Sequence, residues 1–346
     1  MKKIKVLIVD DSAVVRRVLT QIINNEADME VVGTAPNPFL ARDKLVQLTP
    51  DVMTLDIEMP RMDGLTFLKK VMHYFPVPTI IVSSVTRTGC ETSMKALEIG
   101  AVSVIPKPSE AYSIESIERK LVEAIRSASY AKIKKKPVEN IKTNQVDIKP
   151  ISITTTNKII AIGASTGGTE AIKEVLVRLP ANTPGIVMVQ HMPPVFTTAF
   201  AERLNNLCKM QVKEAKDGDV VLPGVALLAP GDYHMVLRRE GARYFVRIKE
   251  GPQVWHQRPA VDVLFKSVSE FAGKNALGVL LTGMGRDGAQ GMQLMKNNGA
   301  INIAQDEKSC VVYGMPKSAV ELGVVDYVEN LFDIPDKIIN LINEKL

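Results

Sequence analysis

The stretch that decides the fold is Lys158-Ile159-Ile160-Ala161-Ile162-Gly163-Ala164-Ser165-Thr166-Gly167-Gly168-Thr169-Glu170-Ala171. Its apolar first half is followed by a glycine-rich turn and by residues that suit a helix, which predicts a strand, a tight turn and a helix. The five residues from Gly163 to Gly167 fit the Gly-x-Ser-x-Gly pattern, in which such a turn exposes a serine hydroxyl. A turn that binds the phosphates of a dinucleotide is the alternative, and this motif alone does not separate the two.

The composition is that of an ordinary globular protein. The chain has 346 residues, of which 46% are hydrophobic and 23% charged, and this length predicts about two domains. The formal net charge is +5, and residues 131–150, with six lysines and two acidic residues, carry +4 of it. Because the rest of the chain is close to neutral, the charge does not indicate a nucleic-acid-binding surface.

The cysteines and the apolar runs indicate the cellular compartment in which the protein works. Cys90, Cys208 and Cys310 are far apart and without paired spacing, which is typical of reduced thiols in the cytosol rather than of a disulfide framework or a zinc site. The run Ile4–Val9 is interrupted by a lysine and ends in two aspartates, so it does not predict a signal peptide. No apolar stretch approaches the roughly 20 residues that span a bilayer. We therefore expect a cytoplasmic protein that is not inserted in a membrane.

The first 126 residues alternate between strand and helix patterns. The expected strands are Ile4–Val9, Glu30–Val32, Asp51–Asp56, Thr79–Ser83 and Val102–Ile105. The expected helices are a segment capped by Ser12 that runs to Asn24, then Pro38–Leu48, Thr92–Gly100 and Ile114–Ser127. Short apolar strands that alternate with helices predict an α/β domain with a doubly wound parallel sheet.

Polar residues follow these strands at the edge where parallel sheets bind ligands. They are Asp10, Asp11, Asp56, Ser83 and Lys107. Carboxylates gathered at one edge repel each other unless a cation lies among them, and such oxygen ligands suit Mg²⁺. A lysine and a hydroxyl beside them would neutralise a phosphoryl group. Each residue alone has a structural alternative, as a turn, capping or surface residue, but their coincidence at strand ends favours a binding site.

The combination of motifs in this half is specific. It consists of Asp10-Asp11-Ser12, Asp56 with Met59-Pro60 and Asp63-Gly64, Ser83, and Lys107-Pro108. Residues 1–126 thereby resemble the receiver domain of two-component response regulators. The resemblance implies a flavodoxin-like fold and phosphorylation of Asp56 by a partner histidine kinase. It further implies that Asp10, Asp11 and Asp56 hold Mg²⁺, and that Ser83 and Lys107 contact the phosphoryl group. Val104 stands where many receivers carry the aromatic residue of their switch.

Residues 127–156 predict a linker between two domains. Lysine clusters, prolines and polar residues occur there without sustained periodicity. A docking strip for an acidic partner is the alternative, and the solvated linker is favoured.

Residues 157–346 return to the alternation of strands and helices. The expected strands include Gly185–Gln190, Val225–Ala229, Tyr244–Ile248, Ala276–Thr282 and Ala300–Ala304, with an antiparallel hairpin within 220–250. The expected helices are Thr169–Leu179, Phe196–Cys208, Ala260–Ala272, Gly288–Asn297, Ser318–Leu322 and Ile334–Leu346. A second doubly wound, mostly parallel α/β domain follows from this order.

Three chemically complementary residues follow separate strands of this second domain. Ser165, His191 and Asp287 each lie just past a strand end, and such ends face one crevice. A serine nucleophile needs a base, and the base needs an acid that holds its tautomer. The order Ser, His, Asp differs from that of α/β-hydrolases. His234 and His256 are weaker candidates for the base, because both are expected in irregular segments.

Two backbone amides are candidates for an oxyanion hole. Met284 lies in the glycine-flanked turn 283–288, where its N–H is expected to point into the crevice, and Thr166 follows the serine. The loss of one such donor typically costs about 3–4 kcal/mol of activation free energy.

Motifs over nearly all of residues 157–346 are similar to those of the chemotaxis protein-glutamate methylesterases. They are Ile162 to Gly168, Gln190-His191-Met192, Ala229-Pro230-Gly231, Arg258 to Phe265, Leu281 to Gly288 and Gly314-Met315-Pro316. The resemblance implies hydrolysis of glutamyl methyl esters on the cytoplasmic helices of chemoreceptors and deamidation of certain receptor glutamines. It implies no cofactor for the hydrolytic step.

The domain order suggests a regulatory hypothesis, in which the receiver blocks the crevice until Asp56 is phosphorylated. Two rival functions fit the sequence less well. A response regulator whose second half binds DNA lacks a recognisable helix-turn-helix and a basic surface. A dinucleotide-dependent oxidoreductase would need a Gly-x-Gly-x-x-Gly spacing, from which Gly163–Gly168 departs.

Overall fold

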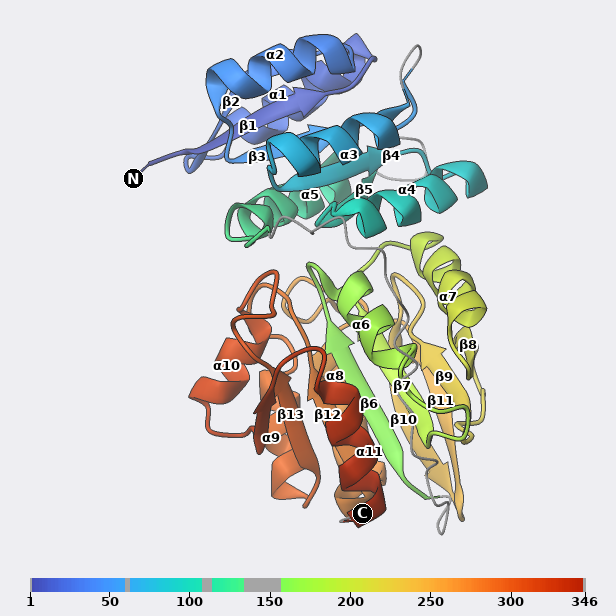
Figure 1. The fold of residues 1–346 in the computed structure, drawn as a ribbon. Coiled ribbons are helices and arrows are strands. Elements are labelled where there is room, and N and C mark those ends of the chain that lie inside the picture. The colour runs from blue at the N-terminus through green and yellow to red at the C-terminus, as the bar shows by residue number, and fades with distance from the viewer. Residues whose placement is uncertain (1, 60–62, 108–113, 134–156, 345–346) are drawn as a thin grey trace. The chain divides into compact units, whose positions relative to one another are not determined.

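A computed structural model describes residues 2–59, 63–107, 114–133 and 157–344. The chain divides into two compact units, Met1–Lys142 and Thr143–Leu346, each with its own sheet (Figure 1). Most of the expected linker, residues 134–156, lies outside the described residues. Within the described ranges, no helix is both long enough and apolar enough to cross a membrane.

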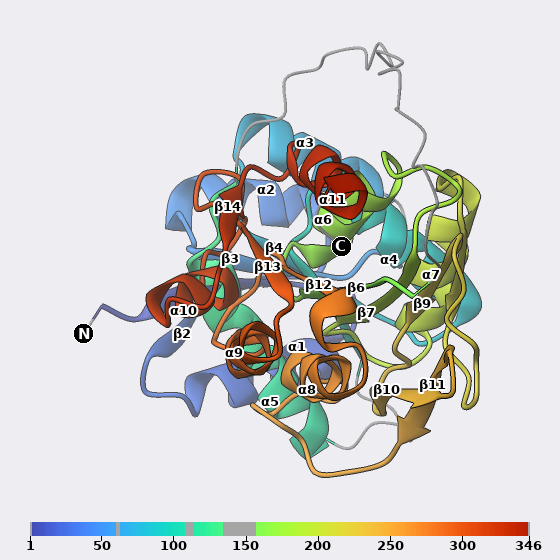
Figure 2. The same ribbon diagram turned by 90° about the horizontal axis from the view of Figure 1, so that it is seen from below.

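The first unit is a five-stranded parallel sheet in the order β2-β1-β3-β4-β5. Its strands are β1 (Ile4–Val9), β2 (Met29–Ala35), β3 (Val52–Leu55), β4 (Thr79–Ser83) and β5 (Ser103–Pro106). Its helices are α1 (Ala13–Asn24), α2 (Pro38–Leu48), α3 (Gly64–Tyr74), α4 (Arg87–Ile99) and α5 (Ile114–Ser129). Figure 2 shows α1 and α5 on one face of the sheet and α2 and α3 on the other. The predicted doubly wound parallel sheet is confirmed.

Local signals explain where these elements begin. Ser12 caps α1 by accepting a hydrogen bond from the Val15 N–H at 3.4 Å, and Asn37 caps α2 ahead of Pro38, whose fixed φ suits a first helical position. β3 is buried at every residue, as expected for a central strand of a parallel sheet.

The sequence prediction missed α3 altogether. Its first residue is Gly64, and Pro60 comes four residues earlier in the sequence; glycine and proline normally interrupt a helical pattern. The helix forms because Asp63 caps it through the Leu65 N–H at 3.0 Å and because Phe67, Leu68 and Val71 are buried. In addition, α5 extends to Ser129, beyond the domain boundary expected at residue 126.

The second unit contains a seven-stranded sheet, order β14-β13-β12-β6-β7-β9-β8, in which every pairing is parallel. Its strands are β6 (Ile159–Ala164), β7 (Gly185–Gln190), β8 (Gln211–Glu214), β9 (Val225–Leu228), β12 (Ala276–Leu280), β13 (Ile301–Gln305) and β14 (Tyr327–Glu329). The antiparallel hairpin of β10 (His234–Glu240) and β11 (Arg243–Lys249) was expected. The short edge strands β8 and β14 were not predicted.

Helices cover both faces of this second sheet. They are α6 (Gly168–Leu176), α7 (Phe196–Leu207), α8 (Val261–Phe271), α9 (Ala289–Asn297), α10 (Met315–Glu321) and α11 (Ile334–Glu344). Figure 2 shows α6 and α11 on one face and α8 and α9 on the other. Because β12, β6 and β7 are neighbours, the loops that follow them lie at one edge of the sheet.

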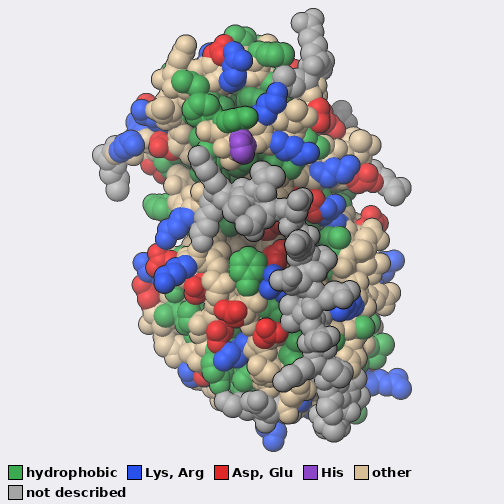
Figure 3. Space-filling view, in the orientation of Figure 1, with side chains coloured by type: hydrophobic (Ala, Val, Ile, Leu, Met, Phe, Trp, Pro, Cys, Tyr) green, Lys and Arg blue, Asp and Glu red, His purple; other side chains and the backbone are tan. Residues whose placement is uncertain are grey.

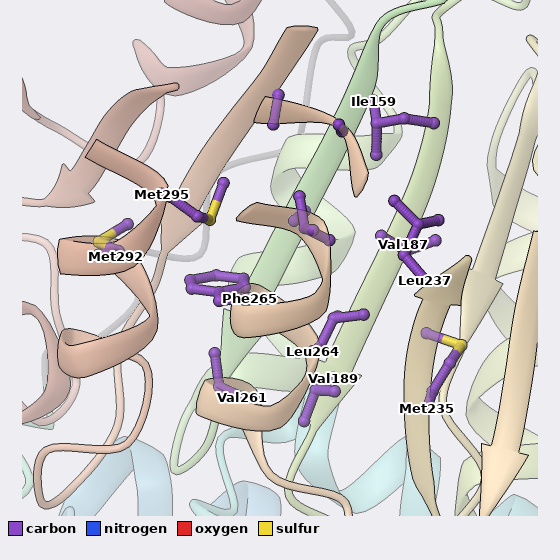
Figure 4. Packing of buried hydrophobic residues seen from close by; sticks show 14 of the residues in the cluster. Ile159, Val187, Val189, Met235, Leu237, Val261, Leu264, Phe265, Met292 and Met295 are labelled. Atoms are coloured by element: carbon purple, nitrogen blue, oxygen red, sulfur yellow. The ribbon is translucent and has the colours of Figure 1, made fainter. Parts of the chain in front are cut away.

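The core of the second unit packs α8 against the centre of the sheet. Val261, Leu264 and Phe265 of α8 are fully buried, and Figure 4 shows them with Val187 and Val189 of β7. The approach is close because β6 carries Gly163, where an added Cβ would lie 2.3 Å from the Val261 Cγ1 atom. The surface, by contrast, intersperses acidic and basic side chains on the visible face of each unit (Figure 3).

Candidate functional site

Ser165 follows β6 at the edge where the strand ends meet. Its N–H donates to the carbonyl of Thr282 at 3.0 Å, and its own carbonyl accepts from the Gly168 N–H at 2.7 Å, which closes the turn before α6. Gly167 has φ +76°, a conformation that favours glycine. An added Cβ there would also lie 2.6 Å from the Val311 side chain. The glycine-rich motif therefore builds the predicted strand, turn and helix.

Gln190, the last residue of β7, ties the serine turn to the histidine loop. Its Nε2 donates to the carbonyl of Ser165 at 2.9 Å and to the carbonyl of His191 at 3.2 Å. Sequence reasoning assigned Gln190 no role, although a buried amide at the end of an otherwise apolar strand was a signal.

The His191 ring and the Asp287 carboxylate meet as expected. His191 Nε2 and Asp287 Oδ2 lie 2.8 Å apart, and the two side chains are 6% and 2% exposed. Nδ1 is therefore the ring nitrogen left for another partner. Ser165 lies at the same edge, directly after β6, the strand next to β7. In the described part of the chain, no hydrogen bond joins its hydroxyl to the ring.

The Asp287 carboxylate is also held by α8. The Val261 N–H donates to Oδ2 at 2.7 Å and the Asp262 N–H donates to Oδ1 at 2.8 Å. These are the first two residues of α8, so Asp287 satisfies N–H groups that a helix start leaves unpaired, and it faces the positive end of the helix dipole. The aspartate consequently presents a fixed orientation to the imidazole.

The turn that carries Met284 is held by the segment 312–315. The Gly283 carbonyl accepts from the N–H groups of Gly314 at 3.0 Å and Met315 at 2.8 Å. A Cβ on Gly314 would lie 3.0 Å from the Met284 Cα, which explains the glycine. Met284 is 36% exposed, and its N–H donates no hydrogen bond within the described ranges.

Thr166 is fixed by a threonine that the sequence analysis did not single out. The Thr282 hydroxyl donates to the carbonyl of Thr166 at 3.0 Å and accepts from the Val312 N–H at 2.9 Å. Thr282 thus links the serine turn to the same segment that holds the turn of Met284.

His234 and His256, the weaker candidates for the base, have different surroundings from His191. His234 was expected in an irregular segment, and that prediction is wrong, since it begins β10 and is 5% exposed. Its Nε2 pairs with the carbonyl of Pro252 at 2.9 Å and its Nδ1 accepts from the Ala260 N–H at 3.3 Å, so both ring nitrogens are occupied. His256 is exposed and has φ +60°.

The acidic residues of the first unit gather as predicted. One carboxylate oxygen from each of Asp10, Asp11 and Asp56 lies within 4.8 Å of the others. Asp10 and Asp56 are buried, whereas Asp11 is exposed. Lys107 Nζ donates to Asp56 Oδ2 at 2.7 Å and lies 3.7 Å from Asp10 Oδ2.

The electrostatics of this acidic cluster fit a cation. Burial, opposed by Lys107 and reinforced by Asp56, raises the pKa of Asp10 to about 6. Burial would lower the pKa of Lys107, but its hydrogen bond to Asp56 and the nearby negative charges raise it above the ordinary value. Asp10 Oδ2 is buried without a hydrogen-bond partner. An orphaned oxygen beside two further carboxylates suits a divalent ion, so the residues present fit Mg²⁺.

Ser83 lies at the end of β4, next to β3. Its hydroxyl donates to the carbonyl of Gly89 in α4 at 3.3 Å. An added Cβ on Gly89 would lie 2.6 Å from the Ser84 carbonyl oxygen, so glycine permits this approach. On β5, Val104 is 6% exposed and pairs with Ile81.

Comparisons with known proteins match both units of the chain. The family model described as CheB methylesterase matches residues 160–338, and the model described as response regulator receiver domain matches residues 6–118. A protein of Syntrophus aciditrophicus named protein-glutamate methylesterase/protein-glutamine glutaminase 2 is 59% identical over 344 residues, which cover 99% of this chain and 100% of the relative. A similarly named protein of Salmonella typhi is 50% identical, covering 98% and 97%.

A solved structure resembles the second unit. The catalytic domain of the CheB methylesterase of Thermotoga maritima is 41% identical, with a TM-score of 0.53, and the match covers 54% of this chain and all of that domain. The receiver and catalytic domains are both matched in one chain, and the curated relatives align over nearly their whole length. The chain therefore belongs to the CheB methylesterase family, with a response regulator receiver domain ahead of the catalytic domain.

Proposed function

We propose that this chain hydrolyses glutamyl methyl esters of chemoreceptors and deamidates receptor glutamines, under the control of phosphorylation. Both reactions attack an acyl carbon and differ in the leaving group, methanol or ammonia, so one site serves both. The single observation that carries the chemistry is the buried pair of His191 and Asp287 at 2.8 Å, beside the turn that bears Ser165.

The hydrolytic mechanism uses three side chains of the second unit. His191 Nδ1 takes the proton from the Ser165 hydroxyl as the oxygen attacks the substrate carbonyl. Asp287 holds the tautomer through Nε2 and stabilises the imidazolium that forms. The imidazolium then protonates the leaving group, and a water that His191 deprotonates releases the carboxylate.

The backbone amides of Met284 and Thr166 are the proposed donors to the oxyanion. Their turns are held by the 312–315 segment and by Thr282, so the donors are fixed before the charge develops. Such preorganised donors stabilise the tetrahedral intermediate at no further reorganisation cost.

The experiment that tests this mechanism is Ser165→Ala assayed on methyl-labelled chemoreceptor. We expect release of labelled methanol to fall by about 10⁶-fold, as in other serine triads. Ser269→Ala is the matched control, because that serine lies on α8 and pairs with Asn298, away from the proposed nucleophile. Retention of activity in the Ser165 variant would exclude this serine as the nucleophile.

The first unit is the proposed phosphorylation site. Asp56 accepts the phosphoryl group from a chemotaxis histidine kinase, and Asp10, Asp11 and Asp56 would hold Mg²⁺, which neutralises phosphoryl oxygens when bound. Lys107 provides a further positive charge. For Ser83 to contact the phosphoryl group it has to give up its bond to Gly89, which would link phosphorylation to α4.

Regulation and compartment follow from the same proposal. The receiver inhibits the catalytic unit until Asp56 is phosphorylated. A shift from mostly inhibited to mostly active requires about 5.5 kcal/mol of differential stabilisation, of which the phosphoryl group supplies part. Because its substrate is the cytoplasmic part of a receptor, the chain works in the cytoplasm and does not act on nucleic acid.

A further inference from the structure

Asp262 is a buried carboxylate that the proposed mechanism does not use. It is the second residue of α8 and is 8% exposed. Its Oδ1 accepts from the Gly288 N–H at 2.9 Å and from the Gly291 N–H at 2.6 Å. Its Oδ2 accepts from the Trp255 indole N–H at 2.7 Å. Three donors therefore converge on one side chain next to the proposed active site.

Asp262 and Asp287 cap each other's helices. Gly288 is the residue just before α9 and Gly291 lies in its first turn, so Asp262 caps α9. Asp287 in turn caps α8 through the N–H groups of Val261 and Asp262. Because Asp287 directly precedes Gly288, the cap on α9 fixes the backbone from which the Asp287 carboxylate projects.

This arrangement has an electrostatic cost. Burial, followed by the negative charge of Asp287, raises the pKa of Asp262, whereas its three donors act in the opposite direction. Two neighbouring buried carboxylates repel each other, and a neutral Ser or Thr would cap a helix without that repulsion. A Ser or Thr at this position would, however, lack the second oxygen with which Asp262 binds Trp255.

Trp255 connects this cap to the other side of Asp287. It has φ +53°, and the Arg286 guanidinium lies 4.0 Å from the centre of its ring. Arg286 is the residue before Asp287 and Gly288 is the residue after it. The residues on either side of the proposed catalytic aspartate are therefore both held by the hydrogen-bonded pair of Asp262 and Trp255.

We propose that Asp262, held by the Trp255 indole N–H, is a positioning residue that sets the Asp287 carboxylate against His191. This inference rests on the proposed serine mechanism. It predicts that Asp262 acts on catalysis only through Asp287 and has no effect on the binding of the receptor.

Asp262→Asn and Trp255→Phe test the inference in the full-length chain. Asparagine keeps one acceptor oxygen but replaces the other by a donor that opposes the indole N–H, and phenylalanine keeps the ring but removes its donor. We expect kcat for release of labelled methanol to fall about 10–100-fold in Asp262→Asn, since small misplacements cost such factors, with KM within about twofold. Trp255→Phe should reduce kcat less, and the double variant should be no slower than Asp262→Asn alone.

The decisive measurement repeats Asp262→Asn in an Asp287→Ala background. If Asp262 acts through Asp287, the second substitution causes no further loss of kcat. A loss that persists there, a change confined to KM, or wild-type kcat in both Asp262→Asn and Trp255→Phe would overturn the inference. Glu270→Gln, which removes an exposed carboxylate from the end of α8, is the matched control and should retain wild-type kcat.

The outcome for Ser165→Ala separates the two proposals. If that variant retains activity, the serine mechanism fails and the role of Asp262 fails with it. If Ser165→Ala is inactive while Asp262→Asn and Trp255→Phe keep wild-type kcat, only the role of Asp262 is refuted.

Discussion

Each unit buries an aspartate at the edge where its parallel strands end, and the two carboxylates have different partners. In the first unit, Asp56 pairs with Lys107 and lies near the carboxylates of Asp10 and Asp11. One oxygen of Asp10 is buried there without a hydrogen bond. In the second unit, Asp287 receives two backbone N–H groups and pairs with His191. The acidic cluster is electrostatically incomplete without a cation, whereas the second site is satisfied by the chain itself.

The largest effect is expected at the site of the second unit, where groups of the chain itself satisfy Asp287. His191→Ala should reduce kcat for ester hydrolysis by about 10⁶-fold, because it removes the base itself. Asp287→Ala should reduce it by about 10⁴-fold, because the aspartate orients the ring and does not react. Release of labelled methanol from receptor measures both. Equal losses would mean that Asp287 is more than an orienting group, and a smaller loss for His191→Ala would remove histidine from the role of base.

Chelation of divalent cations should affect the activity of one site and not of the other. Removal of Mg²⁺ from the full-length chain should slow phosphoryl transfer to Asp56 by about 10²–10³-fold, since metal stabilisation of such transfers is worth several kcal/mol. Basal ester hydrolysis should stay unchanged, because we propose no metal in that step. Incorporation of phosphate is measured with a small-molecule phosphodonor, and release of methanol is measured in a parallel sample without phosphodonor, so that activation by phosphorylation does not contribute. Asp56→Ala provides the baseline for phosphorylation, and a fall of this basal hydrolysis on chelation would contradict the contrast between the sites.

The contrast also explains what sequence reasoning found and what it missed. His191, Asp287 and the aspartates of the first unit were found because they follow predicted strands, and periodicity locates strand ends well. Gln190 and Asp262 were missed because the Ser165 carbonyl and the Gly288 N–H that they bind lie 25 and 26 residues away in the sequence, and no local pattern reveals such pairs.

Local composition misled the prediction in two further places. The α3 helix was missed because it begins at a glycine, Gly64, four residues after Pro60 in the sequence, and its burial of Phe67 outweighs this signal. His234 was placed in an irregular segment because Gly and Pro surround the short β10–β11 hairpin. In both cases tertiary packing decided the structure against local propensity.

A smaller effect is expected where α8 contacts β6. Gly163→Ala would place a Cβ 2.3 Å from the Val261 side chain, and overpacking of this kind costs about 1–3 kcal/mol of the free energy of unfolding. Because the Val261 N–H donates to Asp287, kcat should fall as well. Thermal unfolding and hydrolysis measure the two effects. Gly251→Ala is the control, since its Cβ would approach only the His234 ring, at 3.4 Å. Full activity of Gly163→Ala would show that α8 can shift without disturbing Asp287.

The smallest effect concerns Asp10, and it tests whether the acidic cluster of the first unit is incomplete. The pKa of Asp10 is raised to about 6 in the folded chain from the ordinary 3.8, so the folded state favours its protonated form. That contribution to stability is fully present below about pH 4 and is lost as the pH rises through 6. Asp10→Asn, which is neutral at every pH, should therefore stabilise the first unit by about 1–2 kcal/mol at pH 8 in metal-free buffer and by almost nothing near pH 4.

Added Mg²⁺ should reverse this advantage. The wild-type cluster gains stability from a bound cation according to its affinity, and the variant, with one carboxylate fewer, gains less. Urea unfolding of the first unit at the two pH values, with and without Mg²⁺, measures all four cases. A stabilisation by Asp10→Asn that is the same at pH 4 and pH 8, or that Mg²⁺ leaves unchanged at pH 8, would show that the repulsion within the acidic cluster is already relieved by Lys107.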